Sequence, residues 1–160
     1  MDLLVQIDTD MAFFSTPDVI ADAMEGGDIM LVKHGFPAHL RHLEVRGRFN
    51  AGVQAYRRSA NTDDALEWWS QRCAKWCFDR VEAGRYADQG YLSELARKFE
   101  GVTVCRHPGV NLAPWNWMTR HYTFNDERLL VDCVSWLFFI LPASIQWEEG
   151  VTRPGRLNTE

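Results

Sequence analysis

The sequence lacks the cysteine and histidine patterns of zinc-stabilised and disulfide-rich domains. Its four cysteines include no CxxC pair, and none stands at the spacing of a zinc ribbon or finger. Cys73 and Cys77 are four residues apart within a helical pattern, which puts both on one helix face. We therefore expect free, buried thiols in a reducing compartment.

The sequence is also short of positive charge. Its net charge is −5, and the arginines between Arg41 and Arg58 form a local basic cluster beside a loop. This balance argues against a general binder of nucleic acid or of anionic membranes, which usually carries an extended basic patch. The cluster itself is either a solvated loop face or a contact for an anionic substrate.

No segment is typical of a signal peptide or of a membrane-spanning helix. Asp2 stands where a signal peptide would have basic residues, and the apolar run 131–145 is short and contains Asp132 and Pro142. We therefore expect no transmembrane segment and a cytoplasmic location. With 160 residues and an apolar fraction of 46%, the chain can form one globular domain with a core.

Short apolar runs alternate with helical patterns along the chain, which predicts an α/β domain. We expect the first run to form a parallel strand, and such a strand needs a neighbour on each side. The sequence before it supplies no strand, so the expected sheet looks incomplete at this point. The expected strands cover residues 3–7, 29–32, 51–56 and 102–105, with one or two more within 128–140.

Three helices are expected between these strands. The first is capped by Thr16 and stops at Gly26-Gly27. The longest covers 63–83, with Asn61 or Thr62 as its cap, Gly84 at its end, and a face of Leu66, Trp69, Cys73, Trp76, Cys77 and Val81. A third runs from about Asp88 to Lys98.

Asp8 and Asp10 flank Thr9 directly after the first expected strand. Residues two apart at a strand end point to the same side, so the two carboxylates form a hard-oxygen site suited to Mg²⁺ or Mn²⁺. Such an ion would join the protein to a pyrophosphate and stabilise a departing nucleoside diphosphate. The alternative is a turn that leads into a helix cap.

Two further pairs of residues carry groups suited to a sugar. Asn50 offers a donor and an acceptor beside Gly52, which allows close approach of a ligand backbone or a neighbouring strand. Asp88 and Gln89 begin the third helix, where they either cap it or position a sugar and an acceptor hydroxyl. For Asn50 and Gly52 the alternative is a structural turn.

The loop 107–116 is stiffened by two prolines and a glycine. Its candidate ligand-binding residues are His107, Asn111, Trp115 and Asn116, which supply hydrogen bonds and one flat apolar face. His34 follows a strand end and is expected to face the same cleft. A structural role is the alternative for each histidine.

Taken in order, these elements resemble the nucleotide-diphospho-sugar transferases of the GT-A fold. The resemblance covers about residues 3–124. It rests on the Asp8 to Phe14 motif, the aromatic-Asn-x-Gly-Val strand at 49–53, the tryptophan-containing helix at 68–77, the Asp-Gln motif at 88–92 and the Asn-x-Ala-Pro-Trp-Asn loop at 111–116.

The resemblance implies an incomplete GT-A, Rossmann-like mixed sheet flanked by helices, without the upstream nucleotide-binding half, as in an N-terminally truncated member. Residues 1–125 would form the metal-binding and acceptor-side part, and 126–160 C-terminal strands and an irregular tail. It further implies that Asp8 and Asp10 hold Mn²⁺ or Mg²⁺.

In such an enzyme Asn50, Asp88 and Gln89 would surround the donor sugar and the acceptor. The implied reaction moves a sugar from a nucleotide-diphosphate donor, a UDP-sugar above all, to a glycan, lipid or protein acceptor. The alternative is a non-catalytic remnant or binding subunit of such an enzyme. A paired-carboxylate hydrolase would need Asp88 to face Asp8 and Asp10 across a cleft.

Overall fold

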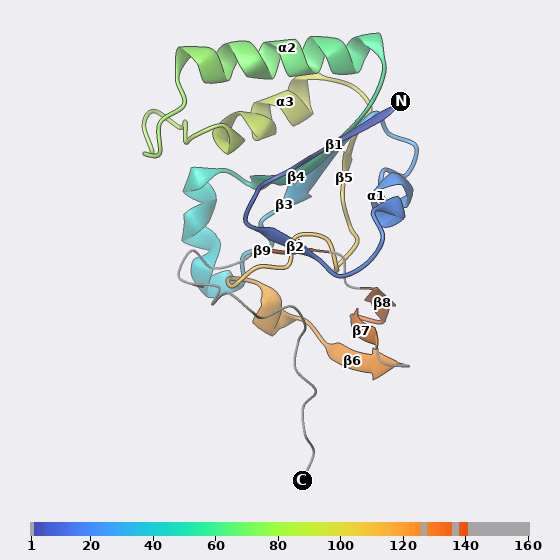
Figure 1. The fold of residues 1–160 in the computed structure, drawn as a ribbon. Coiled ribbons are helices and arrows are strands. Elements are labelled where there is room, and N and C mark those ends of the chain that lie inside the picture. The colour runs from blue at the N-terminus through green and yellow to red at the C-terminus, as the bar shows by residue number, and fades with distance from the viewer. Residues whose placement is uncertain (1, 126–127, 136–137, 141–160) are drawn as a thin grey trace, which may run out of the picture.

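A four-stranded mixed sheet forms the centre of the protein (Figure 1). The computed structural model describes residues 2–125, 128–135 and 138–140. The strand order is β1 (Leu3–Ile7), β4 (Phe49–Arg57), β3 (Ile29–Lys33) and β5 (Val102–Val104). Strand β4 is antiparallel to β1 and β3, whereas β3 and β5 are parallel. The α/β class is confirmed, but the expectation for the first strand was wrong: β1 lies at an edge of this sheet and is antiparallel to its neighbour.

The sheet is covered on both faces, and β3 shows why. Its residues alternate: Met30 and Val32 pack with helix α1 (Asp18–Ala23), while Ile29 and Leu31 pack with α2 (Ala60–Lys75) and α3 (Leu92–Lys98). Successive side chains of a strand point to opposite faces, so a strand buried on both sides is apolar throughout. Figure 1 shows α2 and α3 together over one face and α1 on the other.

Helix α2 ends earlier than predicted, because contacts with other parts of the chain hold Trp76 in an extended conformation. The helix ends at Lys75, and Trp76 is extended, with φ −160°. The Trp76 carbonyl accepts a hydrogen bond from the Tyr91 hydroxyl (2.8 Å), and the Arg85 guanidinium lies 4.6 Å from the Trp76 ring centroid. Cys77 and Val81 are therefore exposed beyond the helix, and Gly84 does not end it.

The cap of α2 is Ser59, not Asn61 or Thr62. The Ser59 hydroxyl accepts a hydrogen bond from the Thr62 backbone N–H at 3.2 Å. Asn61 is used elsewhere, since its amide donates to the Glu100 carbonyl at 2.9 Å. Satisfying a free backbone N–H at the helix start is the usual way in which a serine stabilises a helix.

Replacing Ser59 with alanine is expected to lower the free energy of unfolding by about 1 kcal/mol, because one N–H of the first turn loses its acceptor. Urea unfolding followed by circular dichroism measures this loss. Ser59→Thr retains a hydroxyl at the same place and should lose less than half as much. Equal losses in the two variants would show that the hydroxyl is not what stabilises the helix start.

The other helices also differ from expectation at their ends. Thr16 does not cap α1: Pro17 holds the N-cap position without a side-chain hydrogen bond, and the helix ends at Ala23, before Gly26. The predicted third helix is split into a short 3-10 turn, η2 (Gln89–Tyr91), and α3. Two further 3-10 segments, η1 (Ala38–Arg46) and η3 (Trp117–Thr119), lie in the loops after β3 and β5.

Three short strands lie within the described part of 128–140, where one or two were expected, and they belong to two small sheets. Strand β2 (Met11–Phe13) pairs antiparallel with β9 (Phe138–Ile140). Strands β6 (Tyr122–Asn125), β7 (Arg128–Val131) and β8 (Val134–Ser135) form an antiparallel meander, whose first pairing joins residues on both sides of the 125/126 boundary. The four cysteines are free, with Cys77 and Cys133 exposed and the other two only partly buried, so the expectation of buried thiols was wrong. In the part of the chain with described coordinates, we find no helix with the length and apolarity to cross a membrane.

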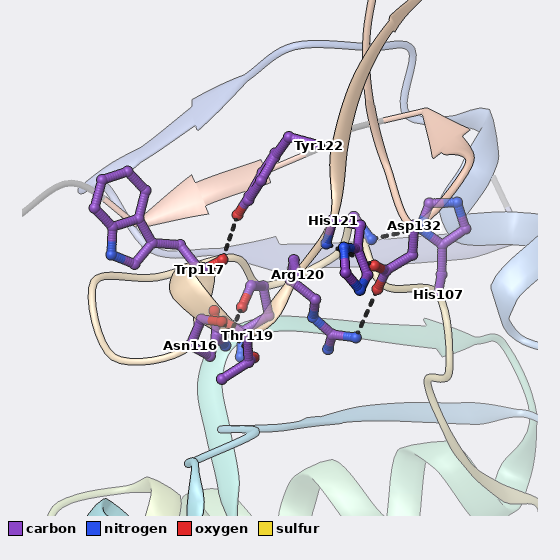
Figure 2. A network of polar contacts seen from close by, with 10 residues as sticks. His107, Asn116, Trp117, Thr119, Arg120, His121, Tyr122 and Asp132 are labelled. Carbon is purple, nitrogen blue, oxygen red and sulfur yellow. Dashed lines mark hydrogen bonds and ion pairs between the residues drawn. The ribbon is translucent and has the colours of Figure 1, made fainter.

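Asp132, in the turn between β7 and β8, contacts the loop that precedes β6 through a hydrogen bond and an ion pair (Figure 2). Its carboxylate accepts a hydrogen bond from the His121 backbone N–H at 2.9 Å and pairs with the Arg120 guanidinium at 3.0 Å. These contacts, the backbone hydrogen bond first, lower the pKa of Asp132 below its usual value. The charged form therefore stabilises the folded state.

Asp132→Asn is expected to cost about 1 kcal/mol at pH 7, because the partly exposed ion pair and one charged acceptor are lost. A carboxyl group with a lowered folded-state pKa stabilises above its unfolded pKa of ~3.9, and this stabilisation disappears as pH falls through the folded-state value. The difference in unfolding free energy between wild type and variant should therefore shrink below about pH 4. A difference that stays constant from pH 7 to pH 3 would contradict this role.

Candidate functional site

The end of β1 is held against β4 at Gly52. The Asp8 backbone N–H donates to the Gly52 carbonyl at 2.9 Å, and the Gly52 N–H donates to the Asn50 side-chain oxygen at 2.7 Å. A Cβ on Gly52 would lie 3.1 Å from that same oxygen, so a larger residue would disturb the contact. The turn that carries Asp8 and Asp10 thus has a fixed place beside β4.

The charges of two other aspartates act on Asp8. Asp8 and Asp10 are both exposed, Asp8 directly after β1 and Asp10 directly before β2. Partial desolvation raises the pKa of Asp8, and the charges of Asp10 and Asp88 raise it further. Asp88 is the N-cap residue of η2, so the predicted Asp-Gln motif supplies one of the two charges that act on Asp8.

Asp8 and Asp10 are the residues that could hold a divalent cation, and only together with a substrate. Among residues 2–125, 128–135 and 138–140, no three His, Cys, Asp or Glu side chains are grouped so that they could hold a metal ion by themselves. Mg²⁺ is commonly bound by one or two carboxylates together with substrate phosphates and water, rather than by a full protein cage. Asp8 and Asp10 can supply the protein share of such a site.

Asp88 is positioned by α2, and Gln89 by the end of the 3-10 segment η1. The Asp88 carbonyl accepts a hydrogen bond from the Trp69 indole at 3.0 Å. The Gln89 amide donates to the Arg46 carbonyl at 3.0 Å, and a Cβ on Gly47 would meet the Gln89 carbonyl at 3.2 Å. The tryptophan of the long helix therefore orients the loop that carries Asp88.

Three buried asparagines join the loop 107–116 to the ends of β3 and β4. Asn50 donates to the Asn111 side-chain oxygen at 2.9 Å, and Asn111 donates to the Lys33 carbonyl at 3.0 Å. Asn116 donates to the carbonyls of His34 and Asn111, and its own oxygen accepts from the Ala113 N–H. These contacts give all three residues a structural role; their contact with a sugar stays a prediction.

His34 and Trp115 contact each other, while their contact with a substrate stays a prediction. The Trp115 indole donates to the His34 carbonyl at 2.8 Å, and the His34 ring stacks on Phe36 with a centroid distance of 4.6 Å. Burial lowers the pKa of His34 to about 4, so its ring is neutral at pH 7. Both ring nitrogens are buried without a hydrogen-bond partner among the described residues.

His107 lies apart from this group. Its Nδ1 accepts a hydrogen bond from the Gly109 N–H at 3.2 Å, within its own turn. The residue lines a separate hollow beside α1, together with Val19, Asp22, Ala23, Glu25 and Arg106. Burial lowers its pKa. The structure therefore brings His34, Trp115 and Gln89 to one cavity and leaves His107 outside it.

The cavity that contains His34 has a volume of about 250 Å³ and is lined by His34, Phe36, Leu43, Arg46, Tyr86, Gln89 and Trp115. Four of these residues, Phe36, Leu43, Arg46 and Tyr86, were not among the predicted site residues. Arg46 belongs to the arginine cluster, and Tyr86 stands two residues before the Asp-Gln motif, so both had a signal nearby. No sequence signal marked Phe36 and Leu43, because their place in the cavity depends on the tertiary position of the chain after β3, including η1.

Comparison with known proteins gives relatives whose function is itself not established. The chain is 27% identical over 146 residues to the uncharacterized protein YfnF of Bacillus subtilis (strain 168). The aligned region covers 87% of this chain and 48% of that protein. It is 29% identical over 136 residues to the uncharacterized protein YfnD of the same organism, over 83% of this chain and 44% of that protein. No family model matches the chain. It thus spans about half the length of the curated relatives that it matches.

Proposed function

We propose that this chain carries the metal-binding and acceptor-side part of a glycosyltransferase that uses a nucleotide-diphosphate sugar, with a GT-A-type arrangement of its sheet. The observation that carries the proposal is that the charges of Asp10 and Asp88 act on Asp8 at the end of β1, while Gln89, the neighbour of Asp88 in sequence, lines the cavity of His34 and Trp115. Acidic residues at a strand end suit a metal-bound diphosphate, and an aromatic-lined cavity nearby suits a sugar.

In this proposal the three aspartates have two different roles in the reaction. Asp8 and Asp10 bind Mn²⁺ or Mg²⁺, which when bound offsets the negative charge of the diphosphate leaving group. Asp88 accepts the proton of the acceptor hydroxyl while the acceptor oxygen bonds to the anomeric carbon and the bond to the diphosphate breaks. The Trp69 indole holds the Asp88 carbonyl for this step, and the Gln89 amide ties the following residue to the Arg46 carbonyl.

The alternative is a unit that binds a sugar nucleotide or glycan without turnover. The matched region makes up 48% and 44% of the two relatives, so a relative's complete activity would involve further chain. The two functions are separable by experiment, because a binding unit would hold the donor without releasing nucleoside diphosphate.

The proposal is tested by measuring the melting temperature with UDP-hexoses in the presence of Mn²⁺ or of EDTA, together with release of UDP. A ligand that binds the folded state raises its apparent stability, by ~2.7 kcal/mol at a concentration of one hundred times Kd. We expect a rise only with Mn²⁺. No rise with any UDP-, GDP- or dTDP-sugar would contradict donor binding, and a rise without UDP release would favour the alternative.

A further inference from the structure

The His34 ring is held in a place where nothing in the described protein satisfies its nitrogens. The residue is 7% exposed, and both Nδ1 and Nε2 are buried without a partner in the part of the chain that the structure describes. Leaving a buried polar group unpaired costs about 1–3 kcal/mol, so such groups call for an explanation. A neutral imidazole has one donor and one acceptor, which a hydroxyl group can serve equally well.

The walls beside His34 are aromatic and fixed in orientation. Phe36 stacks on one face of the imidazole at an interplanar angle of 14°, and Trp115 meets it edge-on with a centroid distance of 5.5 Å. The hydrogen bond from the Trp115 indole to the His34 carbonyl sets the tilt of the Trp115 ring. Flat apolar faces of this kind pack well against the C–H face of a sugar ring.

The size of the cavity restricts what can enter. Its volume of about 250 Å³ lies below the ~300–1,000 Å³ of pockets that hold drug-sized ligands. One six-membered ring fits this range better than a complete sugar nucleotide. The cavity therefore suits an acceptor sugar better than the donor.

The cavity also carries a cationic group at its lining. The Arg46 guanidinium lies 5.6 Å from the Tyr86 ring centroid, and within the described residues it pairs with no carboxylate. No acidic residue lines the cavity. An arginine presents a planar fork of donors that matches carboxylate and phosphate groups.

We propose that the cavity of His34, Arg46 and Trp115 binds a single pyranose ring that carries an anionic group, either a carboxylate or a phosphate. The apolar face of the ring packs on Trp115, and its anionic group meets Arg46. The His34 nitrogens are closed to solvent in the free protein, so they bond ring hydroxyl groups only after the imidazole shifts toward the cavity. The inference rests on the proposed function in one respect: it makes this anionic sugar the acceptor of the transfer. Binding itself requires neither metal nor donor.

The test is isothermal titration of the whole chain with glucose, glucuronate and glucose 6-phosphate, in EDTA. We expect one or both anionic sugars to bind at least ~10-fold more tightly than glucose, since a hydrogen bond to a charged group is stronger than one between neutral groups. Which of the two binds better distinguishes a carboxylate from a phosphate as the natural group.

Matched variants assign the binding to this cavity. Arg46→Gln should remove the preference for the anionic sugars, whereas Arg41→Gln, on the same 3-10 segment but not in the cavity lining, should leave it unchanged. His34→Phe keeps an aromatic ring and removes both nitrogens, so all three sugars should bind at least ~10-fold more weakly. Arg46 is exposed, so its variant should fold even if the His34 variant does not.

Equal affinity for glucose and the anionic sugars, equal effects of the two arginine variants, or no binding of any of the three would overturn the inference. The sugar titrations in EDTA contain neither metal nor donor. The inference and the proposed function can therefore fail separately: metal-dependent donor binding without this sugar binding removes only the acceptor cavity, and the reverse result removes only the transferase reaction.

Discussion

Replacing Asn111 with alanine is expected to lower the free energy of unfolding by about 3–4 kcal/mol, the range of severe single substitutions. Asn111 is 2% exposed and has φ +68°, a left-handed conformation that alanine adopts only at a cost. The variant would also leave the Lys33 carbonyl and the Asn50 amide without their partner. Urea unfolding followed by tryptophan fluorescence measures the loss.

Asn111→Gly separates the two contributions. Glycine accepts the left-handed backbone without strain, so it should be more stable than the alanine variant by about 1 kcal/mol while still lacking the side-chain hydrogen bonds. A total loss below about 1 kcal/mol for alanine would be typical of an ordinary surface position. Such a result would contradict the role of Asn111 as the link between the loop and the sheet.

Asp8→Asn and Asp10→Asn are each expected to weaken Mn²⁺-dependent binding of a UDP-sugar by at least ~100-fold, because each removes one of two protein ligands to the ion. The variants should remain folded. The pKa of Asp8 is raised in the folded protein, so folding disfavours its charge, and a neutral replacement removes that unfavourable contribution. Titration calorimetry in the presence of Mn²⁺ measures the binding.

Asp18→Asn is the matched control for these two variants. Asp18 is an exposed aspartate in the first turn of α1, outside the β1–β2 turn, so its neutralisation changes net charge by the same amount. Donor binding should stay within about twofold of wild type in this control. Equal weakening in all three variants would point to a general charge effect and would contradict a specific role for Asp8 and Asp10.

The strands could be predicted from sequence because each is marked by a local apolar run. Four predicted strands lie where the central sheet has them, within one or two residues at each end. Their pairing could not be predicted, since an apolar run does not show whether its neighbour is parallel. The helix ends failed for a similar reason: contacts of Trp76 with Tyr91 and Arg85, from beyond the helix, decide where α2 stops.

The candidate site shows the same division. Asp8, Asp10 and Asp88 could be singled out by residue type and by their place after a strand or before a helix. The charges of Asp10 and Asp88 act on Asp8 in the folded protein, while a shared metal site stays a prediction. The asparagines were chosen as sugar ligands, but their partners are backbone carbonyls and one another. No sequence pattern distinguishes an amide that binds a ligand from one that holds a loop.

The most direct test of the central claim follows free Mn²⁺ by its electron paramagnetic resonance signal while the protein is added, with and without UDP. Two carboxylates and a diphosphate acting together predict weak Mn²⁺ binding alone and at least ~10-fold tighter binding with UDP. Asp8→Asn should abolish this increase. Mn²⁺ binding that is the same with and without UDP, or an increase that survives in the Asp8 and Asp10 variants, would show that these aspartates do not hold a metal-bound diphosphate.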